Sequence, residues 1–360
     1  MKLKLKKISG SAKSNFITYA LVIVAYIIVQ MCVASGNISS LMKGQLVPIC
    51  AYIVMAISLN LTVGVLGELS LGHAGFMSVG AFSGAVISAV LAEAVPALGL
   101  RLAISMVGGA FFASIAGFLV GIPVLRLRGD YLAIVTLAFG EIIKSIVNNI
   151  YIGLDVNGLQ MSFVKNKLDL AEGGKTLLGG PMGLTGVKTI STFTGGFVLI
   201  LICLFVVFNL TNSRSGRAIM ALRDNRIAAE SVGINVTKYK MMAFVISAGM
   251  AGMAGTLFSL NFSTLVASKF DFNMSILVLV FVVLGGLGNM RGSIIAAALL
   301  TVLPELLRQF RDYRMLIYAI VLILIMLISN NPKLSNLKTN VVNKIKSMFK
   351  PGKKEAKKNV

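Results

Sequence analysis

The chain has 360 residues, of which 56% are hydrophobic and 13% are charged, and its formal net charge is +21. Soluble domains carry about a quarter of charged residues, so this composition excludes an ordinary soluble protein. Several apolar stretches reach the ~20 residues that a helix needs to cross a bilayer, and lipid cannot satisfy the backbone of an irregular chain. We therefore expect an all-α polytopic membrane protein.

The positive charge is concentrated in two tails, residues 1–15 and 331–360. Basic segments that flank a membrane domain indicate cytoplasmic anchors under the positive-inside rule. No nucleic-acid-binding module separates either tail from the apolar stretches, so we expect a lipid bilayer and no nucleic acid as the partner of these charges. Both termini are accordingly predicted on the cytoplasmic side, with the membrane domain spanning residues 16–330.

Hydropathy predicts about ten membrane helices, and an even number agrees with two cytoplasmic tails. They cover roughly 16–34, 46–64, 73–93, 101–122, 131–150, 192–210, 241–265, 274–288, 292–308 and 313–330. In this scheme Arg308, Arg311 and Arg314 fall outside, against the positive-inside rule. An alternative for 274–308 is therefore a pair of re-entrant or broken helices.

The segment GELSLGHAG, residues 67–75, interrupts the second and third predicted spans with a carboxylate and the single histidine of the chain. Each glycine costs a helix ~1 kcal/mol relative to alanine, so several together predict a broken connection. Glu68 and His73 must avoid lipid, and a bend would bring them together. Two interpretations stay open: they line the translocation pathway or its gate, or they close a loop by hydrogen bonds at the cytoplasmic surface.

A polar stripe marks the predicted span 131–150. Glu141, Lys144 or Ser145, and Asn148 recur at helical spacing on one face. A carboxylate inside a membrane helix is a candidate functional group, here for the translocation pathway. The alternative is an intrahelical pair between Glu141 and Lys144 near the outer surface.

Two long polar loops separate the spans. Residues 153–190 are predicted to be external, and a loop of this length favours local structure or a partner. Residues 211–240 are basic and cytoplasmic, and they predict a short helix with Asp224 as its N-cap and Gly233 after its C-terminus. A helix of about eight residues is unstable alone, so it requires a surface to dock on. The alternative is an ordinary surface loop.

One short pattern occurs twice: VLGELSLG from residue 65 and VLGGLGNM from residue 283 share V-L-G-x-L. Internal repeats with broken helices at matching places are common in transporters, although so short a match also arises by chance.

No sequence signal points to catalysis by this chain. There is no G-x-x-x-x-G-K-[ST] nucleotide-binding loop, and the three cysteines lie in apolar segments without metal-ligand spacing. We expect no bound cofactor, no metal and no enzymatic activity in this chain.

Four passages resemble the LivM-like permease subunits of bacterial ABC importers for branched-chain amino acids. They are SLNLTVGVLGELSLGHAGFMSVGAF (58–82), LRLRGDYLAIVTLAFGEIIK (125–144), GRAIMALRDNRIAAESVGINVTKYKMMAFVISAGMAGMAG (216–255) and VLGGLGNMRGSIIAAALLTVLPELLR (283–308). The resemblance implies a fold of about ten helices in the cytoplasmic (inner) membrane. It also implies three kinds of partner: a second, non-identical permease, two cytoplasmic ATPase subunits that bind ATP and Mg²⁺, and an external substrate-binding protein.

The resemblance also implies a role for the cytoplasmic loop, because LRDNRIAAESVG looks like the family's ATPase-coupling element. The residues carried over are Arg223, Asp224, Asn225, Ala228, Ala229, Glu230 and Gly233. We therefore expect a permease subunit that forms half of the translocation pathway for leucine, isoleucine and valine. The alternative substrate is a related small solute such as an amide or urea. The rival outside this class is an ion-coupled secondary transporter in which Glu68 or Glu141 binds the proton or sodium ion.

Overall fold

The computed structural model describes residues 10–36, 39–127, 129–155, 158–163 and 174–307, with positions 313, 316–317, 319–320 and 322–323. The chain divides into two compact units, residues 1–302 and 303–360. Most of the second unit lies outside the described residues, including Arg308, Arg311, Arg314 and most of the tenth predicted span. The description that follows concerns the first unit.

Helices occupy each of the first nine predicted spans. They are α1 (Gly10–Ala34), α2 (Ser40–Asn60) with its π-helical extension η1 (Leu61–Leu66), α3 (His73–Val90), α4 (Leu98–Val124), α5 (Asp130–Asn148), α6 (Phe193–Asn212), α9 (Val236–Ser259), α10 (Phe272–Gly285) and α11 (Met290–Leu306). Within the described residues, seven helices are long and apolar enough to cross a membrane. The polytopic class predicted from composition is confirmed.

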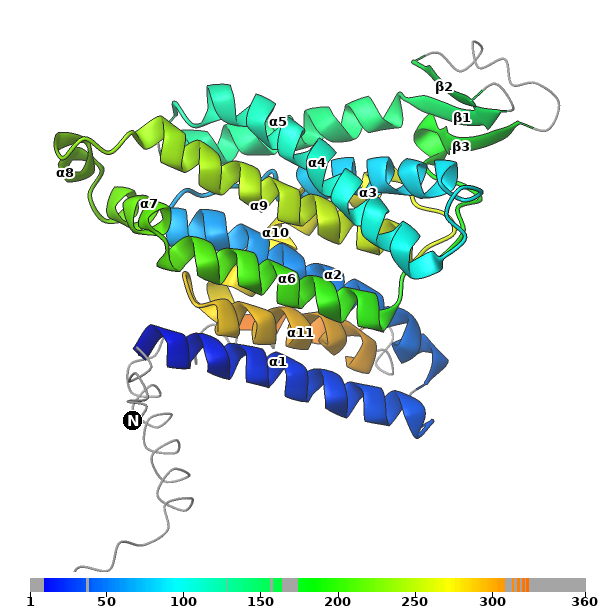
Figure 1. Cartoon of the computed structure of the whole chain (residues 1–360), viewed down its shortest axis with the longest axis horizontal. Helices are drawn as coiled ribbons and strands as arrows, with labels where there is room; N and C mark the ends of the chain where they lie inside the picture. Colours follow the sequence, from blue (N-terminus) through cyan, green and yellow to red (C-terminus); the bar gives the residue numbers. More distant parts are fainter. Residues whose placement is uncertain are drawn as a thin grey trace, which may run out of the picture. The chain divides into compact units, whose positions relative to one another are not determined.

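The centre of the first unit is α9, which packs against α2, α3 and α4 (Figure 1). Small residues permit this packing, because a Cβ added to Gly80 of α3 would lie 2.1 Å from the carbonyl oxygen of Gly252 in α9. Gly109 of α4 approaches Thr256 of α9 in the same way. In lipid, the hydrophobic effect does not drive helices together, because the lipid tails are also apolar. Close backbone contact is therefore a main source of helix association.

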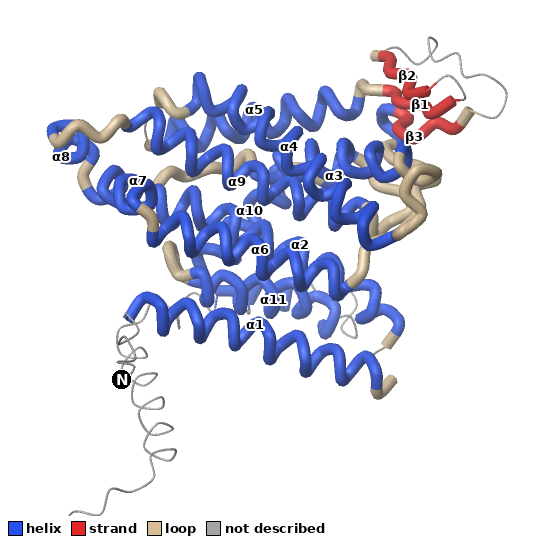
Figure 2. The backbone as a smooth tube through the Cα atoms, viewed as in Figure 1, coloured by secondary structure: helices blue, strands red, loops and turns tan. Residues whose placement is uncertain are grey.

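The loop predicted to be external contains a three-stranded antiparallel sheet (Figure 2). Its strands are β1 (Tyr151–Asp155), β2 (Gly158–Ser162) and β3 (Lys175–Gly179), in the order β2-β1-β3, with Tyr151 opposite both Ser162 and Gly179. The short 3₁₀ helix η3 (Gly180–Met182) follows, and Leu184 then bridges Leu178 to Leu265. Local structure in this loop is confirmed, and it adds a small β element to a chain expected to be all-α.

Two short helices fill the loop between α6 and α9. They are α7 (Arg214–Asp224) and α8 (Arg226–Ser231). Ser213 caps α7 by accepting a hydrogen bond from the backbone N–H of Gly216 at 3.0 Å. The short 3₁₀ helix η4 (Ala267–Lys269) lies between α9 and α10 in the sequence.

Candidate coupling and gating site

The second predicted span ends in an interrupted helix. After η1, Gly67 adopts φ +81°, a left-handed conformation that ends the helix, and residues 67–72 run without regular helix to His73. The N–H of Gly67 donates to the carbonyl of Thr62. Glycine is the residue that reaches this backbone region without strain. The broken connection predicted for residues 64–75 is therefore confirmed.

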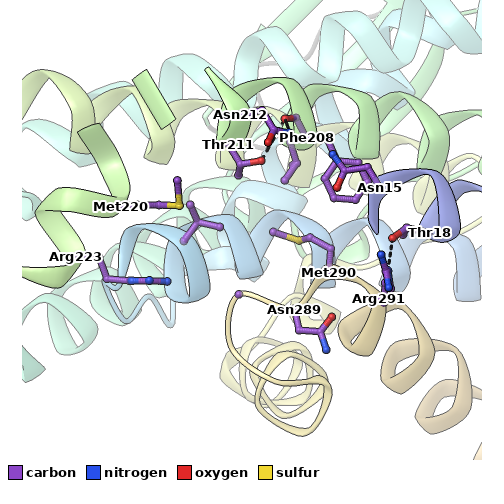
Figure 3. Close-up of a pocket in the computed structure, with 13 residues that line it drawn as sticks. Asn15, Thr18, Phe208, Thr211, Asn212, Met220, Arg223, Asn289, Met290 and Arg291 are labelled. Atoms are coloured by element: carbon purple, nitrogen blue, oxygen red, sulfur yellow. Dashed lines mark hydrogen bonds between the residues drawn. The ribbon is translucent and has the colours of Figure 1, made fainter. Parts of the chain in front are cut away.

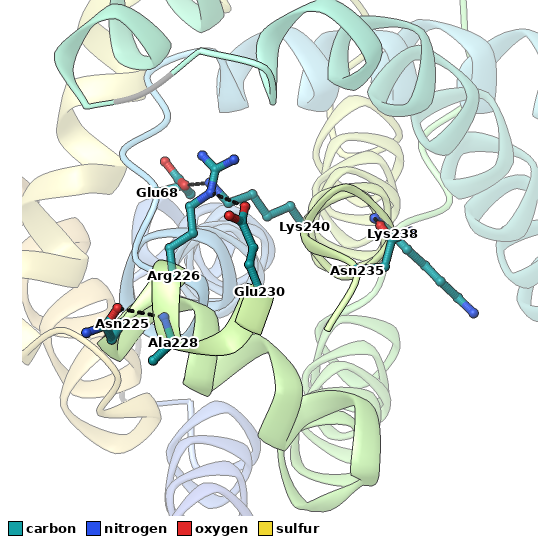
Figure 4. A network of polar contacts seen from close by, with 8 residues as sticks. All are labelled: Glu68, Asn225, Arg226, Ala228, Glu230, Asn235, Lys238 and Lys240. Carbon is teal, nitrogen blue, oxygen red and sulfur yellow. Dashed lines mark hydrogen bonds and ion pairs between the residues drawn. The ribbon is translucent and has the colours of Figure 1, made fainter. Parts of the chain in front are cut away.

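Glu68 forms an ion pair with Lys240, near the start of α9 (Figure 4). Only 15% of the Glu68 side chain and 5% of the Lys240 side chain are exposed. An unpaired charge that is buried to this extent would destabilise the fold by several kcal/mol, and the ion pair offsets this cost for both side chains. The pair joins the interruption to the helix that directly follows α8.

His73 is buried and bonded to hydroxyl groups. Its Nε2 lies 2.8 Å from the Oγ of Ser247, and its Nδ1 lies 3.3 Å from the Oγ of Ser70. Ser247 in turn donates to the carbonyl of Ser58 at 2.7 Å. The expectation that His73 avoids lipid is confirmed. The expected contact with Glu68 is wrong, because the bend directs Glu68 to Lys240, and His73 to Ser70 of the interruption and Ser247 of α9.

A second interruption lies directly against the first. Gly286 (φ +93°) ends α10, and Gly288 (φ +78°) follows before α11 begins. Asn60 joins the two, because its Oδ1 accepts from the N–H of Gly288 at 2.8 Å and its Nδ2 donates to the Oγ of Ser293 at 2.9 Å. The two V-L-G-x-L segments of the sequence therefore fall at two helix breaks that contact each other.

Arg223 connects α7 to the first interruption. Its Nη1 donates to the carbonyl oxygen of Gly64 at 2.8 Å, and its Nε and Nη2 contact Asp224. The aliphatic part of the same side chain covers Gly67, where an added Cβ would lie 2.5 Å from the Cγ of Arg223. Arg223 therefore contacts this chain while 40% of its side chain stays exposed, and its contact with an ATPase stays a prediction.

The ends of α8 are set by capping. Asn225 accepts the N–H of Ala228 at 3.1 Å, so Asn225 is the N-cap (Figure 4), and the prediction of Asp224 is wrong by one residue. Asp224 instead ends α7. Gly233 (φ +84°) and the bond from the N–H of Ile234 to the carbonyl of Ala229 form a Schellman ending. The predicted role of Gly233 is thus confirmed.

Apolar residues form part of the exposed surface of α8 and of its C-cap, beside the exposed Glu230 and Ser231. Ile227 and Val232 are 80% and 75% exposed, and Ala228 between them is also exposed. Ala229 is only 4% exposed and packs inside the loop, so the expectation that it forms the partner surface is wrong. Arg226 and Glu230 pair at 2.9 Å beside this face. Sequence reasoning missed Ile227 and Val232, although two large apolar residues in a basic loop are a usable signal.

Glu141 pairs with Lys144 on α5, which confirms the intrahelical interpretation of their geometry. The Glu141 side chain is 42% exposed on the surface of this chain, and that of Lys144 is 22% exposed. Glu141 also borders a small space beside Asp271 and Ser275. A role in the translocation pathway stays a prediction. Across the described residues, no three or more His, Cys, Asp or Glu side chains gather as a metal site.

The comparison with known proteins agrees with this architecture. Residues 41–326 match the family model described as "Branched-chain amino acid transport system / permease component". The chain belongs to this family. No solved structure matches it.

Several relatives have names that agree with this description. The chain is 38% identical over 286 residues to "High-affinity branched-chain amino acid transport system permease protein LivM" of Salmonella typhimurium and to the protein of the same name from Escherichia coli. These matches cover 77% of this chain and 66% of the relatives, so the chain aligns with just under two thirds of their length. The LivH permease of Salmonella typhimurium is 23% identical over 291 residues, covering 77% of this chain and 89% of LivH.

Proposed function

We propose that this chain is one of two unlike permease subunits of an ABC importer, and that it forms half of the translocation pathway for leucine, isoleucine and valine. The membrane family and the similarity to LivM support the proposal. LivH, a second relative with a different name, supports a heteromeric pair of permeases. The protein would lie in the cytoplasmic (inner) membrane of a bacterium, with both termini cytoplasmic.

The observation that carries the proposal is the exposed apolar face of α8. Six residues cannot hold a helix in water without tertiary support. Here the support comes from Asn225, from the buried Ala229 and from the Gly233 ending, which leaves Ile227, Ala228 and Val232 free of contacts that would bury them. An apolar, rigidly held face outside the membrane suits docking into a groove of a cytoplasmic ATPase.

Two connections link α8 to the interruption, and each consists of a neighbouring helix and a polar side-chain contact. Through α7, Arg223 contacts the carbonyl of Gly64, and through the start of α9, Lys240 contacts Glu68. The interruption contacts the second break through Asn60 and Gly288. A displacement of α8 by ATP binding on the partner would therefore reach both helix breaks, which act as the cytoplasmic gate in this proposal. ATP and Mg²⁺ would bind the ATPase, and this chain would bind no cofactor.

The remaining partners follow from the other exposed features. A charged pair on a membrane helix is costly in lipid, so the Glu141 and Lys144 face of α5 would border the pathway shared with the second permease. The β1–β3 sheet would offer the docking surface for an external substrate-binding protein. Both Glu68 and Glu141 already have lysine partners, which favours this assignment over an ion-coupled transporter that binds its ion at one of them.

The test is copurification of the tagged chain with its partners. Ile227→Asp places a charge in the centre of the proposed ATPase contact. Met182→Asp is the matched control, because Met182 is 69% exposed but lies in the external loop. We expect the wild type and Met182→Asp to retain a second permease and two ATPase chains, and Ile227→Asp to retain the permease alone. Equal ATPase retention in both variants would show that α8 is not the docking element.

A further inference from the structure

The end of the second membrane span, η1, is a π-helix, a form that is rare in proteins and frequent at functional positions. Its backbone hydrogen bonds reach one residue further than those of an α-helix, and the N–H of Gly67 accordingly donates to the carbonyl of Thr62. The N–H of Glu68 donates to the same carbonyl at 3.1 Å. The π-helix therefore holds one residue more than an α-helix would hold in the same turn.

One polar atom of η1 has no partner in this form. The side chain of Thr62 is fully buried, and its Oγ1 makes no hydrogen bond. An unpaired hydroxyl that is shielded from water destabilises the structure that holds it. In an α-helix, a threonine hydroxyl commonly bonds to the carbonyl three or four residues earlier. An α-helical form of η1 would therefore relieve a cost that the π-helical form carries.

The carbonyl of Gly64 takes part in the same choice of form. In an α-helix it would accept the N–H of Glu68, four residues later. Here Arg223 occupies that carbonyl, because its Nη1 donates to it at 2.8 Å. Gly67 is compatible with both forms, since glycine adopts its present φ of +81° as readily as the negative φ of a helix. The π-helical form thus depends on a side chain of α7.

Arg223 has open space beside it. A cavity of about 280 Å³ borders η1, α7 and the turn before α11, and its lining includes Val65, Arg223 and Asn289 (Figure 3). The side chain of Arg223 is 40% exposed, so it keeps access to water when it leaves the carbonyl of Gly64. A movement of α7 is therefore sufficient to release that carbonyl.

We propose that η1 is a two-state element of the gate, π-helical while Arg223 holds the carbonyl of Gly64 and α-helical once α7 withdraws this side chain. The N–H of Glu68 then moves from the carbonyl of Thr62 to that of Gly64. The helix continues through the present break at Gly67. Removal of one residue from the wide turn rotates the chain that follows by about 100°. The link to transport rests on the proposed function; the two forms of η1 do not.

The first test is hydrogen–deuterium exchange of the full chain in detergent micelles, read at the amides of residues 66–68, whose hydrogen bonds break during conversion. Thr62→Val removes the unpaired hydroxyl and with it the advantage of the α-helical form. Ser78→Ala is the matched control, because the Oγ of Ser78 is also buried and unpaired but lies in the regular helix α3. We expect exchange about three- to tenfold slower in Thr62→Val, the effect of one hydrogen bond, and unchanged in Ser78→Ala. Arg223→Met frees the carbonyl of Gly64 and should make exchange faster.

The second test is ATP-driven leucine uptake by the copurified assembly in proteoliposomes. We expect Thr62→Val to reduce uptake by a similar factor, and Ser78→Ala to leave it unchanged. Wild-type exchange at residues 66–68 in either Thr62→Val or Arg223→Met would overturn the two-state assignment. Slower exchange in Thr62→Val with full uptake would show that conversion of η1 is not part of the gate. Leucine uptake without ATP, together with the expected differences in exchange, would contradict the proposed function and support the two forms of η1.

Discussion

The ion pair between Glu68 and Lys240 should contribute strongly to stability. Removing one partner of a buried pair leaves an uncompensated charge and costs about 3–5 kcal/mol. Lys240→Met leaves the charge of Glu68 unpaired, and Glu68 is 15% exposed, so this variant should cost about 3 kcal/mol of unfolding free energy. Glu68→Gln leaves the charge of Lys240 unpaired, and it should cost more because Lys240 is only 5% exposed. The double variant Glu68→Gln/Lys240→Met removes both charges and should recover most of the loss.

A matched control is the pair Arg226 and Glu230 on α8, whose side chains are 31% and 47% exposed. Exposed pairs at this spacing contribute only about 0.3–0.5 kcal/mol. The assay is a double-mutant cycle on the free energy of unfolding, measured in mixed detergent micelles for both pairs. We expect a coupling energy above about 2 kcal/mol for the first pair and below about 0.5 kcal/mol for the second. Additive single variants at Glu68 and Lys240 would refute the reasoning, and so would equal coupling in the two pairs.

Three further predictions concern the interruption and α8 with its C-terminal glycine. Ala228→Trp should reduce the amount of ATPase that copurifies while the chain stays folded, because Ala228 is exposed. Ala229→Trp should make the loop sensitive to limited proteolysis, because Ala229 is buried. The reverse pattern would contradict the orientation of α8. Gly64→Ala should lower thermal stability, since its Cβ would lie 2.2 Å from a backbone nitrogen of the facing loop, whereas Gly44→Ala meets nothing within 4 Å and should not. Gly233→Ala should cost about 1 kcal/mol in unfolding free energy because φ is +84°, and an unchanged value would argue against the left-handed ending.

The interruption was predictable in outline because its signals are local. Glycines at 64, 67 and 72 weaken a helix wherever they occur, and a carboxylate in an apolar stretch requires a polar neighbour. The partner was not predictable, because Lys240 lies 172 residues from Glu68 and only tertiary packing brings them together. The same holds for Ser247, which replaces Glu68 as the neighbour of His73.

The start of α8 was predicted one residue too early. Asp224 and Asn225 are both good N-caps, so sequence preference could not choose between them. The structure uses Asn225, and this choice accompanies a helix in which Ala228 faces outward and Ala229 inward. Consecutive residues of a helix point about 100° apart, so Ala228 and Ala229 can face different environments, and tertiary packing decides which of them is buried. Gly233 was predictable because few other residues adopt its backbone conformation.

We propose that this chain moves a branched-chain amino acid only as part of an ATP-driven assembly. The most direct measurement is uptake of labelled leucine into proteoliposomes that contain this chain, its copurified permease and ATPases, and the substrate-binding protein. We expect uptake that requires ATP and stops when this chain is omitted. Leucine accumulation by this chain alone, driven by a proton or sodium gradient without ATP, would contradict it.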